Sequence, residues 1–154
     1  MALIKSISGI RGTIGGKTGD SLTPIDVVKF SAAFGTWLKR KKPHSLRIVI
    51  GRDARLSGEM VSKLVASTLQ GIGFEVRDLG LSTTPTVEIA VPIENAAGGI
   101  ILTASHNPIQ WNALKLLNGE GEFITGQDGA EVLELAESED FDFAEYLFNK
   151  EITH

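Results

Sequence analysis

A short polar stretch, Thr103–Pro108, holds the residues of this sequence that are best suited by type and spacing to chemistry. It follows directly on Gly98–Leu102, the most apolar run in the chain, which we expect to form a buried strand. In open α/β sheets, ligands bind beyond the carboxyl ends of the strands. Ser105 therefore stands where a reactive hydroxyl group is wanted. Pro108 fixes its own φ and biases Asn107 away from helix, which favours a rigid turn.

Two other interpretations of this stretch stay open on the residues alone. Ser105, His106 and Asn107 are residue types that commonly form turns, so the segment could be purely structural. A serine hydrolase is less favoured because the G-x-S-x-G elbow is missing. The side chains of adjacent residues also tend to point apart, so His106 is poorly placed to deprotonate Ser105. The remaining histidines, His44 and His154, lie beside a predicted helix end and at the terminus.

Composition limits the function classes. The chain has 154 residues, enough for one domain, and its formal charge of −4 argues against a nucleic-acid module. It has no cysteine, which excludes disulfides and thiolate metal sites. No apolar run approaches the roughly 18 residues of a membrane span. Met1–Lys5 lacks the layout of a signal peptide, so we expect a cytoplasmic location.

Strand-like and helix-like segments alternate along the chain, which is typical of α/β layering. Predicted strands cover 46–50, 74–79 and 98–102, and a hairpin joins 113–117 to 122–124. Thr23 and Ser57 are predicted to cap the first two helices, Thr84-Pro85 opens the third helix, and Thr125 starts the fourth. Right-handed crossovers between these elements give a three-layer α/β/α fold with a mixed, mostly parallel sheet.

The ends of the predicted helices carry their own signals. Thr23, Pro24 and Asp26 form a capping-box pattern, and the helix that they open ends in the cations at 39–42. Cations stabilise a helix C-terminus, so this basic run is interpreted as a solvated helix end and not as a binding patch. We expect the third helix to end before Pro92.

The character of the chain changes after the fourth helix, which runs to about Ala136. Residues 137–154 are acidic with interleaved aromatic side chains. We therefore divide the chain into a domain at 1–136 and a terminal segment or linker at 137–154. So many aromatic residues at the end of a domain suggest that the chain is part of something longer.

Three segments together carry a family resemblance. Thr103–Pro108, followed by Trp111–Lys115, resembles the active-site serine loop of the α-D-phosphohexomutases, the phosphoglucomutase/phosphomannomutase family. Ser8–Thr13 is similar to that family's N-terminal G-I-R-G turn, and Gly51–Arg55 to its G-x-D-x-R turn. The three matches occur in the right order over most of the chain. The chain thus resembles the N-terminal domain of the family.

The resemblance implies a phosphoryl carrier. Ser105 would be phosphorylated, would give its phosphoryl group to a sugar monophosphate, and would take the other phosphate back from the bisphosphosugar. The net reaction exchanges the 1-phosphate and 6-phosphate of glucose or mannose. Family members need Mg²⁺, with an oxygen of the phosphorylated Ser105 as one metal ligand. A hard cation with oxygen ligands suits phosphoryl transfer.

The resemblance also assigns supporting roles. Arg11 would lie beside the phosphoserine, where its planar guanidinium suits phosphate oxygens. Lys115 would take part in proton transfer or charge stabilisation at the reacting oxygen. His106 would stay near the phosphate as a donor, and Asn107 would shape the loop. Without the resemblance, Arg11 would pass for a surface turn residue and Lys115 for an edge-strand lysine.

Further residues of the three segments have less defined roles. Arg52, Asp53 and Arg55 would either orient the serine loop through hydrogen bonds or form structural ion pairs. Gly9 and Gly12, on either side of Arg11, would let the backbone approach the anion. Ala113 departs from the pattern, because many relatives have glycine there, and is interpreted as a subfamily trait.

The family's other active-site loops, for metal, sugar and distal phosphate, belong to three later domains, and no D-G-D-x-D-R-like segment occurs here. We therefore expect those domains as partners in the same polypeptide and no turnover by this chain alone. Three alternatives remain: a domain of a phosphoglucosamine mutase, a non-catalytic phosphate-binding module, and a purely structural interaction domain. Covalent phosphate on Ser105 would separate an enzyme from such a module.

Overall fold

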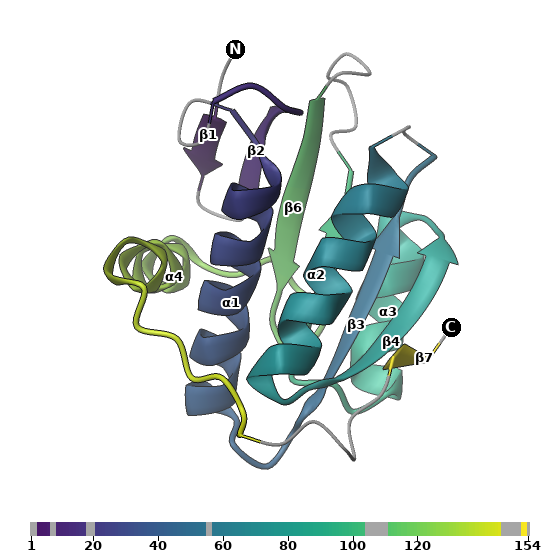
Figure 1. Cartoon of the computed structure of the whole chain (residues 1–154). Helices are drawn as coiled ribbons and strands as arrows, with labels where there is room; N and C mark the ends of the chain where they lie inside the picture. The colour runs from purple at the N-terminus through teal and green to yellow at the C-terminus, as the bar shows by residue number, and fades with distance from the viewer. Residues whose placement is uncertain are drawn as a thin grey trace.

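A mixed sheet between two layers of helices forms the core of the protein, as seen in a computed structural model (Figure 1). The structure describes residues 3–6, 9–17, 21–54, 57–103, 111–145 and 152–153. The helices are α1 (Pro24–Lys41), α2 (Gly58–Ile72), α3 (Thr84–Ile93) and α4 (Gly126–Ser138). In the part of the chain thus described, none of these helices combines the length and apolar character that a bilayer span needs.

The sheet has the strand order β1-β2-β6-β5-β3-β4-β7 in the described residues. The strands are β1 (Leu3–Ser6), β2 (Gly9–Thr13), β3 (Arg47–Arg52), β4 (Glu75–Leu81), β5 (Gly98–Leu102), β6 (Trp111–Leu117) and β7 (Ile152–Thr153). Strands β5, β3, β4 and β7 pair in parallel, whereas β1, β2, β6 and β5 pair in antiparallel fashion. Of the described strands, only β1 and β6 therefore run against the common direction. The predicted mixed, mostly parallel α/β/α fold is confirmed.

Each face of the sheet has its own apolar cluster. The larger cluster joins alternate residues of the strands to α1, α2 and α4, and it includes Ile10, Leu114 and Leu116. The smaller cluster lies under α3 and includes Ile101 and Leu117. Helix α3 packs on β3 and β5 from behind, and α1 and α2 lie side by side in front (Figure 1). Adjacent residues of β6 thus point into different clusters, as the pleat of a strand requires.

Two capping boxes form as the sequence indicates. The Thr23 side chain accepts a hydrogen bond from the backbone N–H of Asp26, and the Asp26 carboxylate accepts one from the backbone N–H of Thr23. Thr125 and Asp128 make the same reciprocal pair at the start of α4. Helix α2 also begins after Ser57, but the Ser57 side chain makes no capping hydrogen bond. Its hydroxyl group instead binds a residue of β6.

The predicted end of α3 before Pro92 is wrong, because the helix continues to Ile93. A proline interrupts a helix through its missing N–H and its clash with the preceding turn. Here Pro92 occupies the last turn, so the missing N–H removes only one helical hydrogen bond. The backbone N–H of Glu94 still donates to the carbonyl of Ala90 at 2.9 Å, which closes the turn.

The predicted hairpin between 113–117 and 122–124 forms only in part. The backbone N–H of Asn118 donates to the carbonyl of Glu122 at 2.8 Å, and Leu117 forms an isolated antiparallel bridge with Phe123. No second strand is present in the described residues 118–124. The antiparallel part of the sheet is formed by β6 together with β1 and β2, and the glycine-rich N-terminal sequence does not predict these last two strands.

The described part of the acidic, aromatic segment packs on the domain. Arg40 forms two hydrogen bonds with the carboxylate of Asp142, Nε to Oδ2 at 2.8 Å and Nη2 to Oδ1 at 3.0 Å. The backbone N–H of Asp142 donates to Thr36 Oγ1 at 3.1 Å, and that of Ala144 donates to the carbonyl of Gly71 at 2.9 Å. The basic end of α1 thus serves as an anchor for this segment. The division of the chain at residue 136 stays a prediction.

Candidate functional site

The site is framed by the carboxyl ends of β3 and β5 and the beginning of β6. Ser105, His106 and Asn107, together with the rest of residues 104–110, lie outside the described residues. The two ends of that segment are described: Thr103 follows β5, and β6 begins at Trp111. The backbone N–H of Thr103 donates to the carbonyl of Ala113 at 3.2 Å, so the two ends lie side by side.

Arg11 and Lys115 lie on the same face of the sheet. Lys115 alternates with Leu114 and Leu116, which point to α1 and α2, so its side chain points to the α3 side. Ile10 points to the α1 side, and its neighbour Arg11 therefore also points to the α3 side. The register places Arg11 opposite Ala113, two residues from Lys115. The two cations are thus a diagonal cross-strand pair.

The diagonal pair places two positively charged side chains on one face of the sheet. Residues in such a relation have Cα atoms about 7–8 Å apart, within reach of one small anion for two long side chains. The Arg11 side chain is exposed and that of Lys115 is half-buried. Two neighbouring cations beside the carboxyl end of β5 raise the local concentration of anionic ligands, even on a chain with a formal charge of −4. The arrangement is suited to binding phosphate.

Gly9 is needed for the packing of two strands, whereas the expectation was that it lets the backbone approach an anion. It pairs with Lys115, and a Cβ atom at Gly9 would collide with the carbonyl oxygen of Leu114. The glycine therefore lets β2 approach β6 closely enough to hold Arg11 in register with Ala113. Ala113 itself is buried and lies directly opposite Arg11.

The turn after β3 contacts both ends of residues 104–110. Asp53 Oδ2 accepts a hydrogen bond from Thr103 Oγ1 at 2.8 Å, and its backbone N–H donates to the carbonyl of Leu102 at 3.0 Å. On the other side, Asn112 Nδ2 donates to Ser57 Oγ at 3.0 Å. Of the two roles expected for Asp53, the orientation of the serine loop is the one that these hydrogen bonds support.

Two arginines of the same turn can be placed less fully. Arg52 is half-buried, and its Nη1 donates to the backbone carbonyl of Asp53 at 3.3 Å. Arg55 lies outside the described residues.

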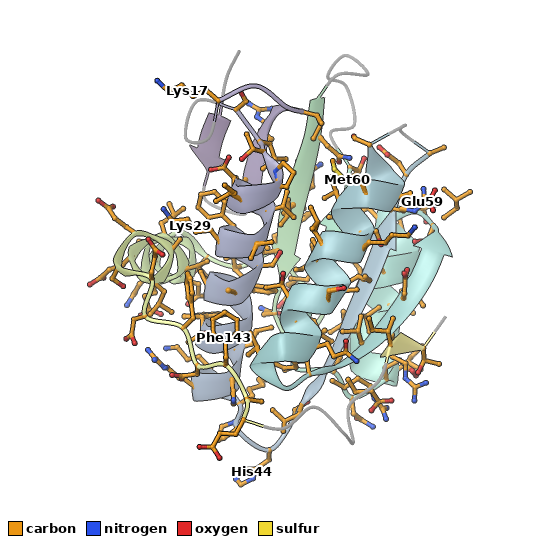
Figure 2. All side chains as sticks on the ribbon, viewed as in Figure 1. Lys17, Lys29, His44, Glu59, Met60 and Phe143 are labelled. Carbon is orange, nitrogen blue, oxygen red and sulfur yellow. The ribbon has the colours of Figure 1, made fainter. Side chains whose placement is uncertain are left out.

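His44 lies at the opposite end of the molecule from Lys17 and from the start of α2, which is marked by Glu59 (Figure 2). It is therefore no candidate partner for the residues at the carboxyl ends of β3 and β5.

Metal-binding side chains do not gather in the described part of the chain. In those ranges, no group of three or more His, Cys, Asp or Glu side chains could hold a metal ion. A carboxylate is present at Asp53, but it accepts a hydrogen bond from Thr103.

Comparison with known proteins decides the family. A family model described as phosphoglucomutase/phosphomannomutase, alpha/beta/alpha domain I, matches residues 3–143. The chain belongs to this family. The match covers the described strands β1 to β6, the four helices and the frame of the site.

Several curated relatives are similar to this domain I. A phosphoglucomutase/phosphomannomutase of Thermococcus kodakarensis is 41% identical over 137 residues, which cover 88% of this chain and 30% of the relative. A phosphoglucosamine/phosphogalactosamine mutase of Sulfurisphaera tokodaii is 34% identical over 146 residues, covering 95% of this chain and 30% of the relative. The chain thus spans about 30% of the length of these relatives.

Solved structures agree on the fold. A putative phosphomannomutase from Thermus thermophilus superposes with a TM-score of 0.78 at 27% identity, covering 88% of this chain and 30% of that one. A phosphoglucomutase/phosphomannomutase family protein from Burkholderia thailandensis gives a TM-score of 0.80 at 23% identity, covering 98% and 32%. The second likeness concerns the fold alone.

Sequence reasoning missed the link between Ser57 and Asn112 in this domain I. The sequence predicts Ser57 as the cap of α2, and Asn112 stands only within the Trp111–Lys115 motif. A signal was present, because Asn112 shares its strand face with Leu114 and Leu116, which point into the core. A polar residue at a core position needs a buried partner. The identity of that partner depends on the fold and was not readable locally.

Proposed function

We propose that the protein containing this chain exchanges the 1-phosphate and 6-phosphate of a hexose, glucose or mannose, with Ser105 as phosphoryl carrier. The observation that carries the proposal is the shared face of Arg11 and Lys115, beside the strand ends from which residues 104–110 depart. Family membership supports the same reaction class. The chain spans about 30% of its relatives, so we assign it the phosphoryl-carrying part of the reaction.

Each side chain has a chemical task in this proposal. The Ser105 oxygen gives up its phosphoryl group to a sugar hydroxyl and later receives the other phosphate of the bisphosphosugar. Arg11 offers a planar, permanently charged group to the phosphate oxygens. Lys115 offers a proton donor and a positive charge near the oxygen that loses or gains the phosphoryl group. His106 is proposed as an additional donor to the phosphate.

A magnesium ion belongs to the proposal as a cofactor. This chain would contribute one ligand, an oxygen of the phosphorylated Ser105, and the described residues offer no cluster of metal-binding side chains beside it. When bound, the ion would neutralise charge on the transferring phosphoryl group. Its remaining ligands are expected from the later domains of the same polypeptide.

Phosphoglucosamine mutase is the second candidate. The relative from Sulfurisphaera tokodaii carries an amino-sugar name and covers 95% of this chain. The frame of the site is suited to phosphate chemistry and leaves the sugar undetermined. A panel of glucose, mannose and glucosamine phosphates, tested on the natural protein that contains this sequence, decides between the candidates.

The central experiment combines two variants of that natural protein. Ser105→Ala should lower kcat by more than about a thousandfold, as removal of a nucleophile does. Lys115→Met keeps the aliphatic stem and should lower kcat by about a hundredfold, the range of general acid or base catalysis. Lys63→Met is the matched control, because Lys63 is an exposed lysine that pairs with Glu59 on α2.

Mass spectrometry completes the test. We expect phosphate on Ser105 in the wild-type protein and its loss on incubation with a hexose monophosphate. Phosphate mapped to another serine, or full activity of Ser105→Ala, would contradict the proposed function. Phosphate that stays on Ser105 without transfer to any sugar would favour the non-catalytic module.

A further inference from the structure

We propose that the turn between β3 and α2 positions the phosphoryl-carrying serine by holding both ends of residues 104–110. In this proposal Asp53, Ser57 and Asn112 are positioning residues, which act through the backbone of that segment and not on the sugar. The proposal rests on the proposed function in one respect, namely that Ser105 is the reacting residue.

The first anchor holds the end of β5. Asp53 binds it twice, through its backbone N–H to the carbonyl of Leu102 at 3.0 Å and through Oδ2 to the Thr103 hydroxyl at 2.8 Å. Thr103 is buried, and a hydrogen bond to a charged group in a buried place is stronger than one in water. Two bonds from one residue fix both the position and the orientation of the chain as it enters the segment.

The second anchor holds the start of β6. Asn112 is fully buried, its Oδ1 accepts a hydrogen bond from the backbone N–H of Ala113 at 2.8 Å, and its Nδ2 donates to Ser57 Oγ at 3.0 Å. A buried amide that loses a hydrogen-bond partner destabilises the folded state. The side chain is thereby fixed in one orientation, and β6 is tied to the start of α2.

Both anchors belong to one short turn. Asp53 and Ser57 are four residues apart, and Ser57 immediately precedes α2, which packs on α1 and on the sheet. The two ends of the serine segment are therefore bound by two residues, Asp53 and Ser57, that lie close together in the sequence. Positioning of this kind matters because a displacement of about 1 Å at a reacting group can cost about a hundredfold in rate.

The experiment removes one hydroxyl at a time from the natural protein that contains this chain. Thr103→Val and Ser57→Ala delete the two side-chain anchors, and Thr103→Ser and Ser57→Thr keep the hydroxyl groups as conservative variants. Ser45→Ala is the matched control, because Ser45 Oγ donates to the carbonyl of Asn95 at 2.9 Å in an exposed turn just before β3.

Positioning predicts a defined pattern. Thr103→Val and Ser57→Ala should each lower kcat by about tenfold with KM changed less than about twofold, and the double variant by about a hundredfold. The conservative variants should recover most of kcat. Amide hydrogen exchange should become faster in peptides that span residues 101–113 and stay unchanged in α1. Ser45→Ala should change none of these readouts.

The outcomes separate this proposal from the proposed function. If Thr103→Val and Ser57→Ala lower the melting temperature but leave kcat within about twofold, the residues are merely structural and positioning is wrong. If the wild-type protein transfers no phosphate to any hexose phosphate, the proposed function fails. In that case the exchange measurement still decides: faster exchange confined to residues 101–113 supports the anchors, and unchanged exchange overturns them.

Discussion

The pair of Arg40 and Asp142 offers a measurable test of how the acidic segment is held on α1. Two parallel hydrogen bonds, at 2.8 and 3.0 Å, join the guanidinium to the carboxylate. Asp140 adds a weaker contact to Arg40 at 3.4 Å. The side chains of Arg40 and Asp142 remain 41% and 42% exposed, so water and salt screen the attraction.

The expected coupling energy follows from that geometry. Exposed ion pairs typically contribute about 0–1 kcal/mol, and a bidentate arginine–carboxylate pair belongs at the upper end of that range. We therefore expect a coupling of about 1 kcal/mol between Arg40→Met and Asp142→Asn at neutral pH and low salt. The measurement is a double-mutant cycle, with the free energy of unfolding in urea for the wild type, both single variants and the double variant.

The pH dependence has a definite sign. The hydrogen bonds from Arg40 lower the pKa of Asp142, which means that the folded state favours the carboxylate. Its stabilising contribution is complete above the ordinary aspartate pKa of about 3.9 and is lost as the pH falls through the lowered folded value. The coupling should therefore shrink in the most acidic conditions in which the domain stays folded, and also in about 1 M salt.

A matched control exists on α2. Lys63 and Glu59 form an exposed pair at 3.0 Å, with side chains 75% and 69% exposed and a single short contact. Its coupling in the same cycle should be clearly smaller. A coupling for Arg40 and Asp142 no larger than that of the control, or one that is unchanged in high salt, would refute the reasoning.

Two further predictions concern stability. Gly99→Ala should lower the free energy of unfolding by about 1–3 kcal/mol, because the new Cβ atom would lie 2.8 Å from Val91 Cγ2 of α3 and 3.1 Å from the Val49 carbonyl; a calorimetric scan that shows no loss would contradict this. Removing the two helix caps, Thr23→Ala and Thr125→Ala, should each cost about 1 kcal/mol, with the larger loss at Thr23 because Thr23 and Asp26 are buried and the Thr125 box is exposed. Equal losses in urea unfolding would show that burial does not strengthen the cap.

Local signals in the sequence predicted most of the elements. The capping box at Thr23 needs three residues of context, and the run Gly98–Leu102 is apolar enough to indicate a buried strand by itself. The exception at Pro92 is also local in origin, because a proline in the last turn removes little from a helix that is about to end. Ser57 shows the limit: its hydroxyl binds Asn112, 55 residues further along the chain.

The site itself was predictable only in its parts. The motifs identify Arg11, Lys115 and the serine stretch, but their arrangement depends on the register between distant strands. Arg11 points to the α3 side because β2 pairs with β6 in this register. The glycine-rich N-terminal sequence predicts neither the pairing nor its register. The orienting role of Asp53 is among the expectations, but the bond between Asn112 and Ser57 is not, because that contact exists only in the folded chain.

The reversed direction of β6 has a consequence for how this site can change over evolution. Lys115 is held in register from both sides, by Gly9 of β2 and by Ile101 of β5. Residues can therefore be added to or removed from the segment between Thr103 and Trp111 without moving Lys115, since the strand pairs and not the length of the connection set its place. A slip of β6 by one residue, in contrast, would carry the lysine into the larger apolar cluster, on the face covered by α1 and α2. The design leaves loop length free to vary while the cation stays fixed.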